Sequence, residues 1–423
     1  MNRLTRIATQ TATSLAKKAI GVDPYILAKA AWERSVIGRS KSARHLEGGG
    51  INLFFQTEIA NSVGKTGRDF AFKLAMGGIP FSVIDTTPKW SAIPRIPDGR
   101  ERDRIRELRT TSAPWRKSVL LNGTDRTSSR DYEIYKEVFY EFGAGFNVFR
   151  DGFFKRVKNI CVFSDFCREL VLRAAGESGS GNVNVVKIRY PFLFPDENRL
   201  SGRSEIRRRF GIPEKAFAVF FNFSLAALPG RKNPEAVVKA LANALGNRRD
   251  ACLVLKTSEG AADGPGVRSL AGFADQCGVA ERLRIVGGNL PMDDVLSLTR
   301  AMDAYLSLHR GEGLGLGMLE AMSLGVPVVA TGYGGNTEFM DERTSFLVPF
   351  KLRMWNAQCG FSKKMGEWAE PDLDCASDIL RSVFDNRQEA EKRAAAARAF
   401  VKEHYSLESF VSDVKTFMEN NPA

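Results

Sequence analysis

The sequence predicts an α/β protein with two domains, each built around a parallel β-sheet, and three observations support this fold class. The chain has 423 residues, which is long for one hydrophobic core and suits two domains of ordinary size. From residue 49 onwards, short apolar runs alternate with helical segments, as they do in βα units. This alternation pauses at residues 190–204, where two prolines and a polar cluster indicate a linker, and then begins again.

Each predicted strand is a short run of apolar and β-branched residues that ends in turn residues. These runs are residues 51–55, 81–85, 118–121, 160–164 and 183–188 in the first half, and 218–224, 251–256, 284–288, 304–308 and 327–331 in the second. Helices are predicted between several of the strands. Near the C-terminus, helical patterns cover residues 371–384 and 389–405, and Ser406 is placed to cap a last helix.

The net charge of +12 is concentrated near the N-terminus, where residues 1–48 hold nine Lys or Arg against Asp23, Glu33 and Glu47. Leucine, isoleucine and alanine recur there at helical spacing, which predicts an amphipathic helix. Two interpretations stay open: this helix lies on an anionic membrane surface, or it packs on the body of the protein. Nucleic acid is not expected as a partner, because the basic residues are not interleaved with stacking aromatics.

Composition indicates a globular protein of the cytoplasm. Hydrophobic residues make up 43% of the chain, and no apolar run approaches the roughly 20 residues that a membrane-spanning helix needs. The six cysteines have no short paired spacing, and no secretory signal precedes them, so we expect reduced thiols. The expected location is the cytosol or the inner face of the cytoplasmic membrane.

A glycine-rich loop in the second half predicts a phosphate site with two carboxylates. Residues 309–331 (HRGEGLGLGMLEAMSLGVPVVAT) lead from this loop into a helix near Leu316, and seven residues separate Glu312 from Glu320. A helix N-terminus presents unpaired N–H groups to an anion, and we expect these from Leu314, Gly315, Leu316 and Gly317. His309, at the preceding strand end, is either part of the site or a packed scaffold residue.

A basic pair earlier in the second half of the chain also lies just before the predicted start of a helix. Arg231 and Lys232 come just before Asn233 and Pro234, where a helix is expected to start. Two cations and a helix N-terminus there would converge on a diphosphate. The alternative is a solvated basic pair at the start of a helix.

Taken together, these segments resemble the GT-B retaining glycosyltransferases, specifically the family 4 group with its Glu-x7-Glu signature. The signature spans Glu312 to Glu320; residues 224–240 resemble the donor-phosphate segment, residues 332–340 the loop that follows, and residues 160–167 the interdomain strand. The resemblance implies two Rossmann-like domains with parallel sheets that face each other across a cleft. It divides the chain into a basic extension (1–48), an acceptor-side domain (49–195), a nucleotide-sugar-binding domain (205–400) and a C-terminal helix (401–423) that packs back on the first domain.

For the reacting groups, the resemblance implies that Glu312 positions the sugar while Arg231 and Lys232 stabilise the departing diphosphate, and we group these three as catalytic. Glu320 would accept hydrogen bonds from the donor ribose. The base and ribose are expected against strand ends at Lys256, Asn289 and Leu290, and Gly64 belongs to a first-domain glycine loop in which Ser62 replaces a usual glycine.

Two further positions concern the acceptor side and metals. Many members of the family have a first-domain histidine near the sugar, whereas this chain offers only Asp125 at a strand end, either an acceptor-side candidate or a turn residue. Asp372 and Asp374 form a DxD pattern, which helix capping explains better than metal binding. We expect neither a metal nor any other cofactor.

The resulting hypothesis is a retaining hexosyltransferase that uses a nucleotide sugar and a glycan or lipid-linked acceptor in bacterial polysaccharide or envelope glycan synthesis. Mannose from GDP-mannose is favoured, because the segments above resemble those of bacterial polysaccharide mannosyltransferases. Two alternatives remain. One is a glucosyl- or galactosyltransferase that uses a UDP-sugar, and the other is a noncatalytic GT-B protein that serves as a scaffold in a glycan-assembly complex.

Overall fold

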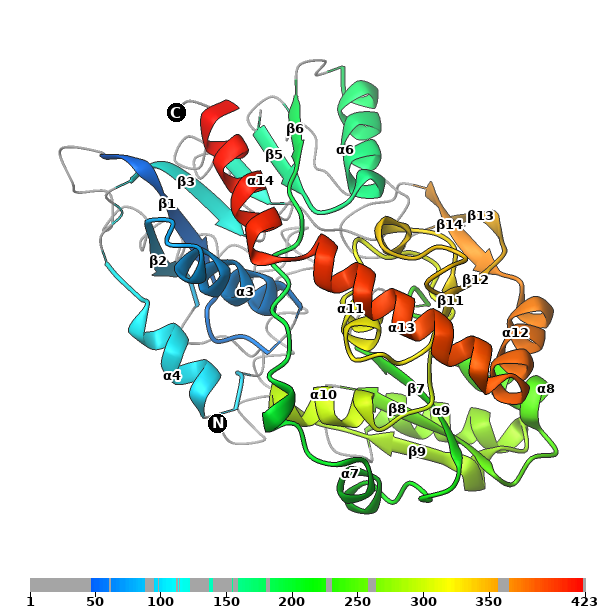
Figure 1. Ribbon diagram of the computed structural model, residues 1–423. Helices are drawn as coiled ribbons and strands as arrows, with labels where there is room; N and C mark the ends of the chain where they lie inside the picture. Colours follow the sequence, from blue (N-terminus) through cyan, green and yellow to red (C-terminus); the bar gives the residue numbers. More distant parts are fainter. Residues whose placement is uncertain are drawn as a thin grey trace, which may run out of the picture.

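The computed structural model describes residues 47–60, 62–87, 95–97, 99–111, 113, 115–121, 137–139, 154, 159–179, 183–225, 230–257, 264–356 and 365–420. Asp125, Cys359 and residues 1–46 lie outside this part of the chain. Two six-stranded sheets organise the described residues, one in each half (Figure 1). The predicted two-domain α/β fold is confirmed.

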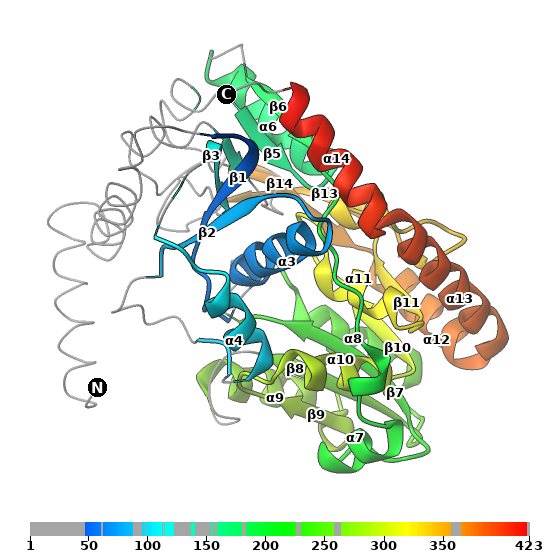
Figure 2. The same ribbon diagram turned by 60° about the vertical axis from the view of Figure 1, so that its left-hand side comes forward.

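The first sheet is parallel throughout, with the strand order β2-β1-β3-β4-β5-β6. Helix α3 packs on β1, β2 and β3, and α6 packs on β5 and β6 (Figure 2). The elements of this domain are β1 (Glu47–Phe55), α3 (Ser62–Met76), β2 (Phe81–Asp85), α4 (Arg100–Glu107), β3 (Trp115–Leu121), β4 (Glu137–Phe139), β5 (Asn159–Val162), α6 (Asp165–Glu177) and β6 (Asn184–Lys187).

The second sheet is also parallel and has the order β12-β11-β10-β7-β8-β9. Its first strand in the chain, β7, lies at the centre beside β10, so the strand order reverses between these two strands. Ligands of doubly wound sheets bind at the carboxyl ends of the strands at such a switch point. The strands are β7 (Phe217–Phe223), β8 (Ala251–Thr257), β9 (Leu283–Val286), β10 (Ala304–Ser307), β11 (Val328–Thr331) and β12 (Phe346–Val348).

Helices cover the second sheet and bury its apolar strands. All seven residues of β8 are buried, as expected for a central strand with helices on both faces. The helices are α7 (Arg203–Arg209), α8 (Pro234–Leu245), α9 (Pro265–Gln276), α10 (Met292–Arg300), α11 (Leu316–Ser323) and α12 (Leu373–Asp385).

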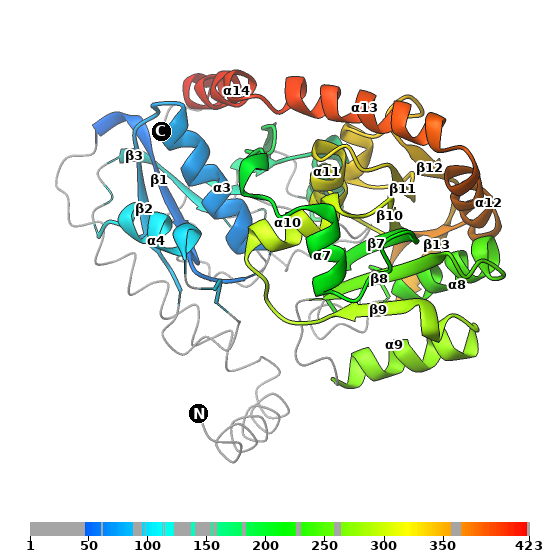
Figure 3. The ribbon, with the colours of Figure 1, turned by 60° about the horizontal axis from the view of Figure 1, so that its bottom comes forward.

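Within the described residues, the chain crosses between the domains twice. The first crossing is the extended segment between β6 and α7, and the second is the junction of α13 (Arg387–His404) with α14 (Leu407–Asn420) (Figure 3). Helix α13 contacts α11, whereas α14 packs on α3 of the first domain, where the rings of Phe70 and Phe410 lie 5.3 Å apart. Lys73 of α3 donates hydrogen bonds to the carbonyl oxygens of Phe192 and Tyr405, and so joins both crossings.

All ten predicted strands exist, and the structure has four others that were not predicted. Strand β4 has only three residues and β12 also has three, too short for a periodic pattern. The antiparallel pair β13 (Phe350–Asn356) and β14 (Met365–Pro371) mixes charged and apolar residues. Strand β1 begins two residues before the expected boundary at 49, and α7 begins two residues before 205. Among the described residues, no helix has the length and apolar character needed to cross a bilayer.

Candidate active site

The loops that follow β7 and β10 meet at the switch point of the second sheet. Arg310 N–H donates to the carbonyl oxygen of Arg231 at 2.8 Å, which joins the two loops directly. Asn233 adopts a left-handed conformation (φ 53°) just before α8, and its side-chain amide donates to the carbonyl oxygen of Leu308 at 2.9 Å. Residues at least 75 positions apart in sequence are thereby held together at the edge where a ligand is expected.

Glu312 lies between the two predicted cations at this edge. Its side chain is 9% exposed, Lys232 forms a direct ion pair with it, and Arg231 Nη1 lies 3.4 Å from Oε2. Arg231 also donates to the carbonyl oxygen of Gly311 at 2.7 Å. Burial alone would raise the pKa of Glu312, but the charges of Lys232 and Arg231 hold this pKa at about 2. The carboxylate is therefore ionised at neutral pH. It neutralises Lys232 and Arg231, which the sequence predicted to face a diphosphate.

Close backbone packing explains the glycines of the loop. A Cβ atom at Gly335 would lie 1.7 Å from the carbonyl oxygen of Gly313, and Gly335 N–H donates to the carbonyl oxygen of Glu312 at 2.8 Å. Gly315, at φ 96°, precedes α11, and a Cβ at Gly317 would lie 2.3 Å from Tyr305 Oη. This packing fixes the start of α11, where the N–H groups of Leu316 and Gly317 come before the first intrahelical bonds, from Met318 and Leu319 to the Gly315 carbonyl oxygen.

His309 is buried and tied to the surrounding backbone. Its Nε2 lies 2.9 Å from the carbonyl oxygen of Tyr333, which can only accept, so this nitrogen carries the proton. Nδ1 then accepts from the Ser307 hydroxyl at 3.0 Å. Burial lowers the pKa of His309 and keeps the ring neutral. These contacts make His309 a link between the end of β10 and the loop at residues 332–336.

Glu320 faces the first domain. Its carboxylate is buried, lies 3.7 Å from Lys65 Nζ, and has a raised pKa because burial disfavours the charged form. Lys65 also pairs with Asp69, which accepts a hydrogen bond from Tyr190 at 2.7 Å. A cavity of about 450 Å³ begins at Glu320, Lys65 and Asp69 and extends between α3, α4, α10 and the linker. It does not include Glu312 or Lys232 in its lining.

Gly64 lies in the first turn of α3, next to Lys65. A Cβ there would lie 2.4 Å from the carbonyl oxygen of Ile59, so the local packing of the β1–α3 loop already requires a glycine. The loop is held by Arg68, which donates to the carbonyl oxygens of Thr57 and Ile59 at 3.1 and 3.0 Å. The presence of a glycine at position 64 is therefore explained by local packing, whether or not a donor binds there.

The predicted base-side residues lie together at the ends of β8 and β9. Lys256 is buried at the end of β8 and donates to the carbonyl oxygen of Gly288 at 2.9 Å. Asn289 and Leu290 follow and are partly buried. Asp372 accepts from Cys375 N–H at 3.0 Å as the cap of α12, and within the described ranges no group of three His, Cys, Asp or Glu residues could hold a metal ion.

Two groups of contacts near the site had no signal in the sequence. From the first domain, Ser164 Oγ donates to the carbonyl oxygen of Gly313 at 2.7 Å, so the segment after β5 supports the glycine-rich loop. From the β13–β14 pair, Glu370 accepts two hydrogen bonds from Arg310, at 2.6 and 2.7 Å, and the Arg310 guanidinium lies over the ring of Trp368. Both contacts join residues more than 50 positions apart, which periodicity does not reveal.

Comparison with known proteins agrees with this geometry. Residues 202–354 match the family model described as glycosyl transferases group 1. This part of the chain belongs to the group 1 glycosyltransferases. The match includes the group 1 segments around Lys232, Glu312 and Glu320, which confirms the family resemblance.

Individual relatives are distant. The chain is 26% identical over 232 residues to the GDP-mannose-dependent alpha-(1-6)-phosphatidylinositol monomannoside mannosyltransferase of Mycobacterium tuberculosis, covering 53% of this chain and 52% of that protein. It is 33% identical over 149 residues to the D-inositol 3-phosphate glycosyltransferase of Salinispora tropica, covering 34% and 30%. The chain thus spans about half the length, or less, of these curated group 1 relatives.

Solved structures share the arrangement of both domains. The structure of Anabaena HepE in complex with UDP and glucose superposes with a TM-score of 0.58 at 14% identity, covering 88% of this chain and 100% of that one. At this identity the likeness concerns the fold alone. The fold is GT-B, as the sequence predicted.

Proposed function

We propose that this protein is a retaining glycosyltransferase that moves a hexose from a nucleotide sugar to a glycan or lipid-linked acceptor. The observation that carries the proposal is Glu312, buried between Lys232 and Arg231 at the switch point of the second sheet. A binding domain freed from catalysis has no physical need to bury a carboxylate with two cations at this edge. The arrangement suits a site in which charge must be stabilised as the diphosphate departs.

The donor would occupy the site from the switch point towards the linker. Its diphosphate would take the place of Glu312 as the partner of Lys232 and Arg231, beside the first-turn N–H groups of α11. Glu312, released from part of this ion pair, would then contact a sugar hydroxyl. Glu320 would accept from the ribose diol, and the leaving phosphate would take the proton of the attacking acceptor, so no second carboxylate is needed.

GDP-mannose is the donor that we favour. The relative from Mycobacterium tuberculosis is a GDP-mannose-dependent enzyme by its name, and the segments around Lys232 and Glu312 resemble those of mannosyltransferases. A UDP-sugar is the alternative donor, because the HepE structure, which has a similar fold, was solved with UDP and glucose. The two relatives act, by their names, on a phosphatidylinositol mannoside and on an inositol phosphate, so we infer an acceptor that carries phosphate. Synthesis of a bacterial envelope glycan in the cytoplasm fits such a reaction.

A donor panel tests the proposal. Purified protein is incubated with GDP-mannose, UDP-glucose and UDP-galactose, and binding and slow donor hydrolysis are measured for the wild type and for Glu312→Ala. We expect one donor to bind and hydrolyse slowly, and Glu312→Ala to lose hydrolysis by at least about tenfold, because a positioning contact is removed. If no nucleotide sugar binds, the noncatalytic scaffold becomes the better account.

A further inference from the structure

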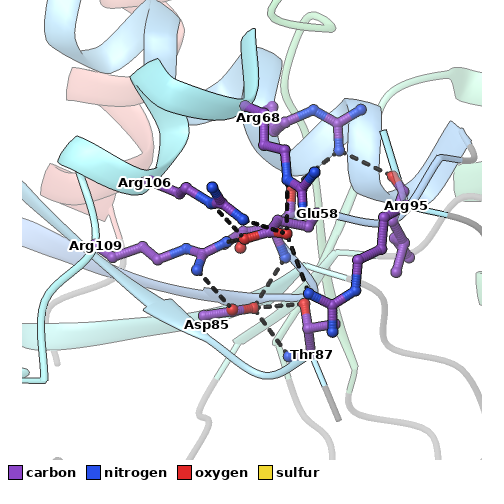
Figure 4. A network of polar contacts seen from close by, with 10 residues as sticks. Glu58, Arg68, Asp85, Thr87, Arg95, Arg106 and Arg109 are labelled. Atoms are coloured by element: carbon purple, nitrogen blue, oxygen red, sulfur yellow. Dashed lines mark hydrogen bonds and ion pairs between the residues drawn. The ribbon is translucent and has the colours of Figure 1, made fainter. Parts of the chain in front are cut away.

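Four arginines converge on one buried glutamate in the first domain (Figure 4). Glu58 follows β1 and is 3% exposed at its side chain. Its Oε2 accepts from Arg95 at 3.2 Å and from Arg102 at 3.0 Å, its Oε1 accepts from Arg106 at 3.0 Å, and Arg109 donates to the same Oε1. We call these four arginines and Glu58 the arginine cluster.

Among the residues that the structure describes, more guanidinium groups than carboxylates gather at the arginine cluster. Arg109 Nη1 lies 3.4 Å from Asp85, and the neighbouring Arg68 pairs with Glu101 at 2.7 Å, so five guanidinium groups face three carboxylates. Asp85 is already occupied by the N–H groups of Thr57 and Thr87 and by the Thr87 hydroxyl. Guanidinium groups that share one carboxylate repel each other. One arginine would be enough to neutralise Glu58.

A dissolved anion can reach the arginine cluster. The side chains of Arg95 and Arg106 are 42% and 44% exposed, whereas Arg102 and Arg109 lie deeper. Two buried nitrogen atoms, Nε of Arg109 in the cluster and Nε2 of Gln56 two residues before Glu58, have no hydrogen-bond partner among the described residues. Buried N–H donors without acceptors are costly, and a ligand oxygen would supply one.

The arginine cluster also lies at the edge of the first sheet that an acceptor must approach. Glu58 follows the carboxyl end of β1, and Asp85 ends β2. Arg68, which holds the Glu58 loop, stands on α3 three residues after Lys65, and Lys65 reaches Glu320 of the second domain. The arginine cluster and the predicted ribose contact are therefore connected through one short helix segment.

We propose that the arginine cluster is an anion site that binds a phosphate group of the acceptor. The proposal rests on the proposed function and specifies its acceptor as a phosphate ester. Guanidinium groups bind phosphate oxygens through paired N–H donors, and several around one pocket suit a dianion. Glu58 is the counter-ion of the guanidinium groups until the phosphate replaces it as their partner.

The first test measures phosphate binding with the donor site blocked. Wild-type protein is saturated with GDP and UDP, so that Lys232 and Arg231 are occupied, and inorganic phosphate is added in a calorimetric titration. We expect Arg106→Gln and Arg95→Gln each to weaken phosphate binding roughly tenfold, as the loss of a charged hydrogen bond does. The matched control is Arg104→Gln, because Arg104 belongs to the same helix but lies over the ring of Phe72 and should change binding less than about twofold.

The outcomes separate this inference from the proposed function. If the wild type does not bind phosphate, or if all three variants bind it equally, the arginine cluster is only a structural ion-pair network and the inference is wrong. If Arg106→Gln or Arg95→Gln fails to fold, the inference is tested with the other variant and with Glu58→Gln. Glu58→Gln should tighten phosphate binding, because it removes the carboxylate that competes with phosphate for the arginines. Donor hydrolysis without acceptor should be the same in Arg106→Gln and the wild type. If neither the wild type nor Arg106→Gln hydrolyses a donor, the proposed function is wrong, whereas the measured phosphate binding remains valid.

A second test compares acceptors. Transfer is measured to a sugar with and without a phosphate monoester, for the wild type, Arg106→Gln and Arg104→Gln. We expect the wild type and Arg104→Gln to prefer the phosphorylated acceptor, and Arg106→Gln to lose that preference through a higher KM at similar kcat. Equal use of both acceptors by the wild type would contradict the inference.

Discussion

Glu312 acts as a built-in counter-ion at the switch point. Arg231 and Lys232 come from one loop and Glu312 from another, and the ion pairs between them hold the two loops together. A diphosphate carries the negative charge that Glu312 supplies in its absence. We therefore expect Glu312 and the donor to compete for the same two cations.

This competition predicts how Glu312→Gln behaves. Without ligand, the variant should lose about 1–3 kcal/mol of unfolding free energy, because two partly buried cations lose their partner. Adding a nucleoside diphosphate should restore more stability to the variant than to the wild type. Thermal unfolding with and without the diphosphate measures both effects, and equal stabilisation of the two proteins would contradict the counter-ion role.

The pH dependence of stability provides a second measurement on the same variant. The pKa of Glu312 is about 2 in the folded protein and near 4.5 as the ordinary value, so its contribution is complete above about pH 4.5. That contribution disappears as pH falls towards 2. Unfolding free energy should therefore decrease less steeply between pH 4.5 and 2 in Glu312→Gln than in the wild type. The remaining decrease includes Glu58, whose pKa is also about 2 despite its burial, because of Arg106 and Arg109.

At this scale the sequence predicted which residues gather, but not how they pair. Glu312, Lys232 and Arg231 were found through their loop and helix settings. The ion pairs between them were not predictable, because they join segments 80 residues apart whose contact depends on the sheet order. The arginine cluster was missed for the same reason, since Glu58 lies 37 to 51 residues before its partners.

Among the elements around the site, two loops fit together because Gly335 has no side chain at their contact. The loop after β11 lies against the glycine-rich loop before α11, and Gly335 meets Gly313 without room for a side chain. His309 and Asn336 join the same region through a contact of 3.2 Å. The start of α11 therefore depends on the loop at residues 332–336.

A pair of glycine substitutions tests this dependence. Gly335→Ala should destabilise the protein by about 1–3 kcal/mol or more and weaken donor binding, because the new methyl group overlaps a backbone oxygen. Gly272→Ala is the matched control in α9, where a Cβ meets nothing within 4 Å, and it should stabilise the protein by about 0.5–1 kcal/mol. Denaturant unfolding and nucleotide binding measure both variants. Unchanged donor binding in Gly335→Ala would show that the two loops are not coupled.

Elements with strong periodicity were predictable, and short or mixed ones were not. The prediction placed β2 at residues 81–85, as observed, because an isolated apolar run between turn residues has one clear interpretation. The β13–β14 pair was missed although FKLRM alternates apolar and charged residues as a strand does, and the structure leaves Leu352 and Met354 of that apolar face exposed. Tertiary contacts hold this strand pair in place, namely those of Glu370 and Trp368 with Arg310.

At the scale of the whole molecule, the two domains are joined by more than the linker. Helix α14 returns to α3, and Arg189 donates to both carboxylate oxygens of Asp413 on α14. Across the cleft, Lys187 pairs with Glu338 at 3.0 Å. Any closure of the domains on a donor must accommodate these contacts, which lie on the side of α14 and α6.

The basic extension gives a prediction for the whole protein. A chain that lacks residues 1–46 retains all of β1, so it should fold and bind its donor like the full chain. If the extension binds an anionic surface, the deletion should reduce binding to vesicles that contain phosphatidylglycerol, with little change for neutral phosphatidylcholine vesicles. Co-sedimentation measures this, and unchanged binding to the anionic vesicles would favour a helix that packs on the body.

The proposed donor site requires that Lys232 contact the diphosphate of a nucleotide-sugar donor. It is tested most directly by measuring how tightly the wild type and Lys232→Ala bind a nucleoside diphosphate and the corresponding nucleoside. We expect Lys232→Ala to weaken diphosphate binding by about 1.5–3 kcal/mol, a factor of ten or more, and to leave nucleoside binding almost unchanged. Equal weakening of both ligands, or of neither, would contradict it.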